Sequence, residues 1–187
     1  MTRTKSTYLT LLAVLLSPMA ANADPIPPTA TLWAGNGHYY ELIRTPMTWE
    51  DALIAASDAG GYLATVTSQA EYDFIKELIL VSGYYAWLGG SDSASEGDWV
   101  WASNSSDAFL YTAWRSGEPN NCCGGEHYLV MYVFPNDEGW NDEPLSNGDW
   151  IVRRWSVREY EVPEPGTLAL LGLGLAGMGL ARRRKKV

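Results

Sequence analysis

Residues 114–142 read WRSGEPNNCCGGEHYLVMYVFPNDEGWND, and this stretch decides the fold. It contains two groups of side chains with oxygen donors: Glu118, Asn120 and Glu126, then Asn141 and Asp142. Calcium takes about six to eight oxygen ligands from carboxylates, amides, backbone carbonyls and water. Pro119 restricts the backbone and permits a cis peptide bond, which would turn Glu118 and Asn120 towards one point. The stretch therefore predicts a calcium site formed by two separate loops.

The Glu-Pro-Asn tripeptide alone would equally fit a solvated loop rich in Gly and Asn. Here it is accompanied by further motifs, in this order: Trp87-Leu88-Gly89, Glu96-Gly97, Trp99, Trp101, Trp114, Glu126 and Trp140-Asn141-Asp142. An upstream group precedes them: Trp49, Ala52, Gly60, Gly61 and Leu63. Together these residues resemble a C-type lectin domain. The resemblance covers residues 33–160, which is nearly everything between the two ends of the chain.

This resemblance implies an α+β, C-type lectin-like fold, with two helices flanking small antiparallel sheets and a long calcium-binding loop region. It implies that five residues bind the principal Ca²⁺: Glu118, Asn120, Glu126, Asn141 and Asp142. Asp142 would contribute its carboxylate and its backbone carbonyl. The other four would also hydrogen-bond two neighbouring sugar hydroxyls, because carboxylates accept and amides donate. The Glu-Pro-Asn order is similar to the mannose-type arrangement, so we expect recognition of equatorial 3- and 4-hydroxyls.

An auxiliary calcium site is suggested by Asp92 and Glu96 together with Asn121 and the shared Glu126. The family usually has an acid at the position of His127, and losing that carboxylate lowers the charge of the site. We expect the His127 side chain to face solvent at the end of a strand.

The two cysteines of the chain, Cys122 and Cys123, are adjacent. Neighbouring side chains diverge, so this pair cannot link distant parts of the fold. A strained ring, free thiols and a bridge to another chain remain open. A zinc cluster with His127 is disfavoured, because the spacing does not supply four ligands. The disulfides usual in the family are missing, so the long loop should depend more on calcium for order.

Capping signals predict two helices. Thr48 with Asp51 and Ser68 with Glu71 have capping-box spacing, and Gly60-Gly61 supplies a stop. Strands are expected at residues 39–43, 62–66, 87–90, 99–101, 127–133 and 150–157. Four tryptophans are expected in the core, although one of them could stack on a sugar: Trp99, Trp101, Trp114 and Trp140.

Both ends of the chain resemble sorting signals. Basic residues, an apolar run and small residues predict a signal peptide at residues 1–23, followed by a Pro-rich lead at 24–32 and the lectin-like domain at 33–161. Residues 162–187 contain Pro163-Glu164-Pro165, an apolar segment and a basic end, and they resemble a bacterial PEP-CTERM signal; a permanent tail anchor is the other interpretation. The resemblance implies transient insertion in the inner membrane, processing by an exosortase-type enzyme, and release to the cell surface or beyond.

Charge and residue pattern exclude several functions. Residues 24–161 contain 21 acidic and 6 basic residues, a net charge of −15, which argues against binding nucleic acid. The two histidines belong to no nucleophile-and-base pattern, and the carboxylates are expected on a metal, so we predict no enzyme. The leading hypothesis is a secreted, calcium-dependent lectin for glycans or exopolysaccharide. The alternative is an adhesive matrix protein that uses the same domain to bind protein partners.

Overall fold

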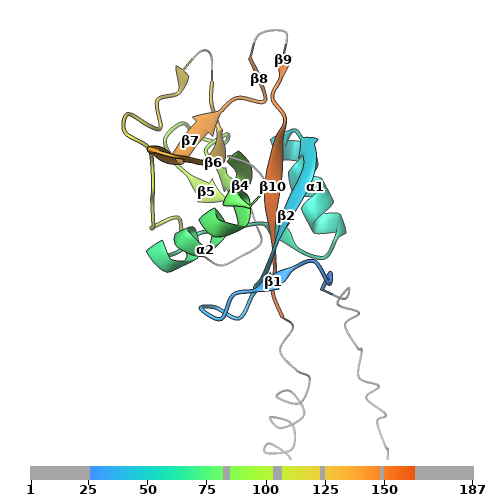
Figure 1. Cartoon of the computed structure of the whole chain (residues 1–187). Coiled ribbons are helices and arrows are strands. Elements are labelled where there is room, and N and C mark those ends of the chain that lie inside the picture. Colours follow the sequence, from blue (N-terminus) through green and yellow to red (C-terminus); the bar gives the residue numbers. More distant parts are fainter. Residues whose placement is uncertain (1–25, 82–84, 103–106, 123–124, 148–149, 163–187) are drawn as a thin grey trace, which may run out of the picture.

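Strand β10 (Arg154–Tyr160) lies at the centre of the main sheet (Figure 1). The computed structural model describes residues 26–81, 85–102, 107–122, 125–147 and 150–162, so the predicted signal peptide and C-terminal segment lie outside it. The sheet has the order β1-β2-β10-β4-β6-β7, while β3 pairs with β10 and β5 pairs with β4. Its other strands are β1 (Thr31–Leu32), β2 (Tyr39–Met47), β3 (Tyr62–Leu63), β4 (Tyr85–Ser91), β5 (Val100–Trp101), β6 (Tyr128–Phe134) and β7 (Asp137–Glu143). A separate hairpin joins β8 (Ser146–Asn147) and β9 (Trp150–Ile151).

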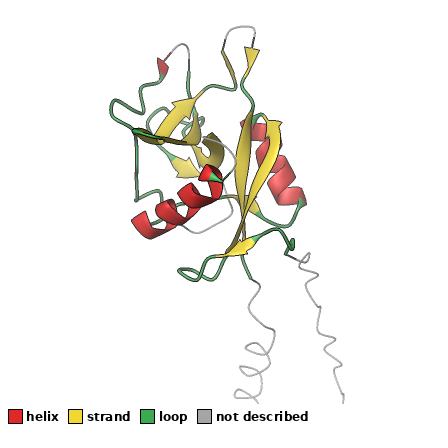
Figure 2. Cartoon of the chain, viewed as in Figure 1, coloured by secondary structure: helices red, strands yellow, loops and turns green. Residues whose placement is uncertain are grey.

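The predicted α+β class is confirmed, but the sheet arrangement differs from the small antiparallel sheets that we expected. One sheet of eight strands forms, and β10 pairs with β4 in parallel, with Trp155 opposite Ala86. The other pairings within this sheet are antiparallel. The parallel pairing joins strands far apart in the sequence, which a local strand pattern cannot reveal. The two helices flank the long strands (Figure 2).

Helix α1 (Trp49–Asp58) begins where the capping signal predicts. The Thr48 side chain accepts a hydrogen bond from the Asp51 backbone N–H, as an N-cap residue should. At the other end Gly60 has φ +74° and the Gly61 N–H donates to the Ala56 carbonyl, so the chain leaves the helix through a left-handed residue. The Trp49 indole donates to the Leu88 carbonyl at 2.8 Å, which ties α1 to β4.

Helix α2 (Gln69–Leu80) also begins at its predicted cap, Ser68, which accepts from the Glu71 N–H at 3.2 Å. The Glu71 side chain does not complete a capping box. Its Oε2 accepts from the backbone N–H and hydroxyl of Thr67 at 2.7 and 2.8 Å, one residue before the cap. Glu71 is therefore a buried structural carboxylate, and not a solvated cap residue.

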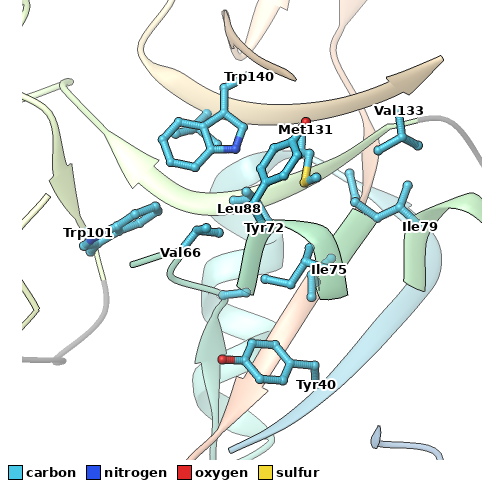
Figure 3. Close-up of a cluster of buried hydrophobic side chains, with 14 residues drawn as sticks. Tyr40, Val66, Tyr72, Ile75, Ile79, Leu88, Trp101, Met131, Val133 and Trp140 are labelled. Atoms are coloured by element: carbon cyan, nitrogen blue, oxygen red, sulfur yellow. The ribbon is translucent and has the colours of Figure 1, made fainter. Parts of the chain in front are cut away.

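Two groups of buried side chains fill the core. The larger lies between α2 and the sheet (Figure 3) and includes Ile75, Ile79, Leu88, Met131 and Trp140. The second lies against α1 and includes Trp49, Ala56, Leu63, Trp87 and Val130. The expected core role of the four tryptophans is confirmed: Trp140 and Trp101 are buried, and Trp99 and Trp114 pack against the same cluster.

The predicted strands form, with different bounds. Residues 64–66, expected at the end of a strand, continue as an extended segment whose Thr65 N–H bonds a side chain, Glu159 Oε2, at 2.9 Å. Strand β2 runs on to Met47, and the expected strand at 150–157 is divided into β9 and β10. Strand β7 is absent from our expectations, because its sequence DEGWNDE is mostly polar; it forms by pairing along the whole of the apolar strand β6.

Two buried carboxylates, Glu71 and Glu159, join the N-terminal strands, the start of α2 and β10. The Tyr40 hydroxyl lies 2.5 Å from Glu71 Oε1 and 3.0 Å from Glu159 Oε1. His38 Nδ1 lies 2.6 Å from the same Glu159 oxygen. Each carboxylate is 1% exposed and accepts hydrogen bonds on both oxygens. These hydrogen bonds offset the free-energy cost of burying the charge.

We expect this cluster to make stability depend on pH through His38. The hydrogen bond to Glu159 raises the pKa of His38 above its usual 6.5; burial opposes the shift, and the charges of Glu159, Glu161 and Glu71 add to it. The folded state therefore holds this proton more tightly, so the contribution is complete below pH 6.5 and is lost as pH rises through the folded pKa. Urea unfolding of wild type and His38→Gln across this pH window measures the contribution of His38 to the free energy of unfolding. If the difference in this free energy between wild type and His38→Gln does not fall with rising pH, His38 is not the group responsible.

Within the described residues, neither helix is long and apolar enough to cross a membrane.

Candidate calcium site

The loop that carries the Glu-Pro-Asn motif is held against strand β7. Trp114 forms a parallel bridge with Trp140, the Arg115 N–H donates to the Trp140 carbonyl at 2.9 Å, and the Trp140 N–H donates to Ala113 at 2.7 Å. Gly139 permits this approach, because it has φ +130° and a Cβ there would lie 2.8 Å from the Ala113 carbonyl oxygen. The two predicted ligand groups are thereby brought side by side.

The carboxylate of Asp142 reaches directly into this loop. Asp142 is 1% exposed on β7, and its two oxygens accept the backbone N–H groups of Asn120 at 3.2 Å and Asn121 at 2.7 Å. The Glu118–Pro119 peptide bond is cis, as the sequence allowed. Asn141 and Asp142 therefore lie on a strand, and the expectation that both ligand groups come from loops is wrong for this half of the site.

Asn120, Asn121 and Glu126 meet around the next turn of the loop. The Cys122 N–H donates to Asn120 Oδ1 at 2.8 Å and to Glu126 Oε2 at 3.0 Å. Asn121 Oδ1 accepts the Glu126 N–H at 2.9 Å. Cys122 is disulfide-bonded, so it is not a free thiol, which was one of the alternatives that the sequence left open. Cys123 lies outside the described residues.

The carboxylates of the loop and of β7 lie close enough to repel one another. Burial and then the charge of Asp142 raise the pKa of Glu118, while Arg115 opposes the shift. Burial also raises the pKa of Glu126; the Cys122 N–H opposes this, and the charges of Asp142 and Glu118 add to it. A cation between these groups would relieve the repulsion.

The ligand atoms that the proposed site offers fit calcium. Within the described part of the chain, Glu118 Oε2 is buried without a hydrogen-bond donor, and the Asp142 carboxylate lies beside it. A buried anionic oxygen with no donor is costly unless a cation contacts it. The surrounding predicted ligands offer carboxylate and amide oxygens, and Glu118, Asn120 and Glu126 lie partly or fully exposed to solvent. These residues could hold Ca²⁺ and leave part of its shell open.

Arg115 is a member of this site that the sequence did not identify. Its guanidinium forms an ion pair with Asp137 at 2.7 Å, lies 4.8 Å from the centre of the Tyr132 ring, and places Nη1 3.5 Å from Asn141 Oδ1. The Asn141 Nδ2 group donates to the Asp142 backbone carbonyl at 2.5 Å. Arg115 thus contacts the Asn141 amide, and its positive charge opposes the rise in the pKa of Glu118.

The residues predicted for an auxiliary calcium site do not all come together. Asp92 and Glu96 form a group with His127, whose ligand atoms lie within 4.8 Å of one another, while Glu126 and Asn121 bond within the neighbouring loop. His127 Nδ1 lies 3.0 Å from Asp92 Oδ1, so the expectation that this side chain simply faces solvent is wrong. The reason is that Asp92 and His127 close the β4–β6 ladder from opposite strands, where the Asp92 N–H donates to the His127 carbonyl.

Comparison with known proteins agrees with this architecture. Residues 45–147 match the Lectin C-type domain family, which is more than half of the chain. The chain belongs to the C-type lectin family. Domains of this family are carbohydrate-binding and non-catalytic, and generally depend on calcium. Residues 161–185 of this C-type lectin match the PEP-CTERM protein-sorting motif, which is a signal for export.

Individual relatives come from distant organisms. Halomucin of Haloquadratum walsbyi is 32% identical over 135 residues, which are 64% of this chain and 1% of that protein. The C-type lectin lectoxin-Lio1 of Erythrolamprus poecilogyrus is 29% identical, with 78% of this chain and 90% of the relative covered. The CD209 antigen-like protein 2 of Macaca mulatta is 30% identical over 70% of this chain and 49% of its own length. The C-type lectin described here therefore spans only part of two of these three relatives.

Solved structures show the same fold. The cow C-type carbohydrate-recognition domain of CD23 has a TM-score of 0.61 at 22% identity, with 74% of this chain and 98% of that chain covered. A calcium-dependent type II antifreeze protein has a TM-score of 0.61 at 25% identity, with 73% and 100% covered. Both superpose on the lectin domain over nearly their whole length.

Proposed function

We propose that this C-type lectin is an exported protein that binds glycans through calcium, with a mannose-type preference. One observation carries the proposal: Asp142 on β7 bonds the loop after the cis proline and lies beside Glu118, whose Oε2 has no hydrogen-bond donor among the described residues. A set of oxygens held in this way, at the surface and with excess negative charge, is suited to a divalent cation.

Five side chains would hold the ion: Glu118, Asn120, Glu126, Asn141 and Asp142. Bound calcium supplies an electrophilic centre for two neighbouring hydroxyls of a sugar. Around it the chain's own residues set the recognition, because Glu118 and Glu126 accept hydrogen bonds while the amides of Asn120 and Asn141 donate them. Arg115 fixes the orientation of Asn141 and therefore which hydroxyl can receive its N–H.

The Glu-Pro-Asn order resembles the mannose-type arrangement of the family, and this resemblance supports recognition of equatorial 3- and 4-hydroxyls. Glu118 comes before Pro119 and Asn120 after it, so a hydroxyl pair must present its acceptor to Asn120 and its donor to Glu118. Mannose and glucose offer such pairs. Two relatives fit this proposal by their descriptions: the bovine CD23 domain was solved with a GlcNAc2Man3 oligosaccharide, and a murine dendritic cell receptor domain with an N-glycan.

The sorting motif supports a proposal for where the protein acts. We infer that an exosortase-type enzyme processes the C-terminal segment after transient insertion in the inner membrane, and that the lectin domain then acts at the cell surface or in extracellular polymer. Single-sugar sites at a protein surface bind weakly, so display of many copies on one surface would supply the avidity.

Calorimetric titration of the purified protein with mannose and with galactose tests the function. In about 10 mM calcium, well above the 10⁻⁴–10⁻³ M range of many extracellular calcium modules, we expect heat with mannose, and none after chelation. The double variant Glu118→Gln with Asn120→Asp exchanges acceptor and donor groups while preserving size, so preference should move to galactose by about tenfold or more. Binding that is insensitive to chelator, or unchanged in this variant, would refute the calcium-dependent mechanism.

A further inference from the structure

Asp92, Glu96 and His127 form a second cluster, apart from the five proposed calcium ligands. Asp92 follows β4, Glu96 lies in the adjoining loop, and His127 precedes β6. Each offers one ligand atom, and these atoms lie within 4.8 Å of one another. Among the described residues, this is the group of His, Cys, Asp and Glu side chains whose ligand atoms lie close enough together to hold one metal ion.

The loop of the cluster is built around Asp92. Asp92 is 1% exposed, and its Oδ2 accepts the Gly97 N–H at 2.8 Å while its backbone carbonyl accepts the Ser95 N–H at 2.9 Å. Oδ1 is left to face His127 Nδ1 at 3.0 Å. The backbone thus fixes one carboxylate oxygen and aims the other at the imidazole.

The other two groups approach from the solvent side. His127 Nδ1 lies 3.5 Å from Glu96 Oε2, and the side chains of His127 and Glu96 are 33% and 51% exposed. One ligand is therefore buried and preorganised, while the other two border water and can adjust by a rotamer. An ion can enter without unfolding the loop.

The donor types favour a transition metal over calcium. One imidazole nitrogen with two carboxylates is a set that zinc accepts, with water in the remaining position. Calcium requires about six to eight oxygens, and a nitrogen in place of one carboxylate removes both an oxygen and a charge. Imidazole with carboxylate also suits cobalt, nickel and copper, whose affinities for such a site rise in that order.

We propose that Asp92, Glu96 and His127 form a binding site for zinc or a similar N/O-preferring divalent ion, separate from the calcium-dependent sugar site. The two sites share no side chain. Glu126 and His127 are adjacent in the sequence but belong to different sites. Glu126 Oε2 accepts the Cys122 N–H in the loop, whereas the His127 side chain contacts Asp92 beyond the end of β4.

The chain offers a matched control for the test. It has two histidines, and His38 contacts Glu159 in the other cluster of buried carboxylates. The full chain, kept oxidised, is titrated with zinc in about 10 mM calcium as wild type, His127→Gln and His38→Gln. We expect one equivalent of zinc in wild type and His38→Gln, and an affinity at least about tenfold weaker in His127→Gln, since even supporting residues of metal sites cost that much.

A spectroscopic measurement on wild type avoids dependence on the variants. Imidazole ¹⁵N resonances of the two histidines are followed during zinc addition, and only the Nδ1 signal of His127 should move to the position of a metal-bound nitrogen. Unmoved His127 resonances, or equal affinity of wild type and His127→Gln, would each overturn the site. None of these readouts involves sugar, so they stand apart from the lectin test.

Discussion

Replacement of Asp142 by Asn is expected to weaken calcium binding by about ten- to a hundredfold and to abolish calcium-dependent binding of sugar. The carboxylate is buried, lies beside Glu118, and accepts two backbone N–H groups of the Glu-Pro-Asn loop. Asn keeps one acceptor oxygen but removes a charge and replaces the other oxygen with a donor. That donor would face the Asn120 or Asn121 N–H, so the loop should separate from β7 as well.

Calorimetric titration with calcium, followed by mannose, measures both effects. The matched control is Asp73→Asn on helix α2, where the carboxylate accepts from Gln69 at an exposed position and contacts none of the proposed ligands. The control should bind calcium as wild type does. Retention of sugar binding by Asp142→Asn would show that β7 does not contribute to the ion's shell.

Replacement of Trp140 by Ala is expected to lower the free energy of unfolding by about 3–5 kcal/mol, the range for large aromatic residues truncated in cores. Trp140 has no exposed surface, and its ring centre lies between 5.7 and 6.0 Å from those of Trp101, Phe109, Tyr111 and Trp114. These neighbours come from two segments, β5 and residues 109–114, and cannot all move in to fill the space.

Urea unfolding in the presence of chelator measures this loss without a contribution from calcium. Leu110→Ala is the control, because Leu110 is 87% exposed and its truncation should change stability by less than about 0.5 kcal/mol. A loss below about 1 kcal/mol for Trp140→Ala would mean that the aromatic cluster repacks freely. Calcium affinity should fall in the same variant, since Trp140 precedes Asn141 and bonds the loop through its backbone.

Local signals in the sequence were sufficient to place the starts of both described helices. Thr48 and Ser68 cap their helices as predicted, because capping depends only on residues within one turn. The cis peptide before Pro119 and the meeting of Asn120 with Asp142 also agree with the sequence prediction. Here the motif order carried information on distant contacts that residue spacing alone does not contain.

Features set by tertiary pairing were not predictable in the same way. Strand β7 is polar and forms because β6 supplies a partner; the turn through Pro135 and Asn136, with Asn136 at φ +66°, was the available signal. Arg115 approaches Asn141 only because the Trp114–Trp140 bridge aligns two segments. His127 meets Asp92 only through the β4–β6 ladder, so a lone histidine near a strand looked like a surface residue.

The strand order has a consequence for how the domain would be presented. Tyr160 at the end of β10 pairs with Tyr39, and β1 pairs beside it, so the first and last described residues emerge at one pole of the domain (Figure 1). Strand β7 and the hairpin β8–β9 lie at the other pole. A tether attached beyond Val162 would therefore leave β7, with the proposed calcium site, pointing outward, and cutting that tether would remove no strand of the described sheet.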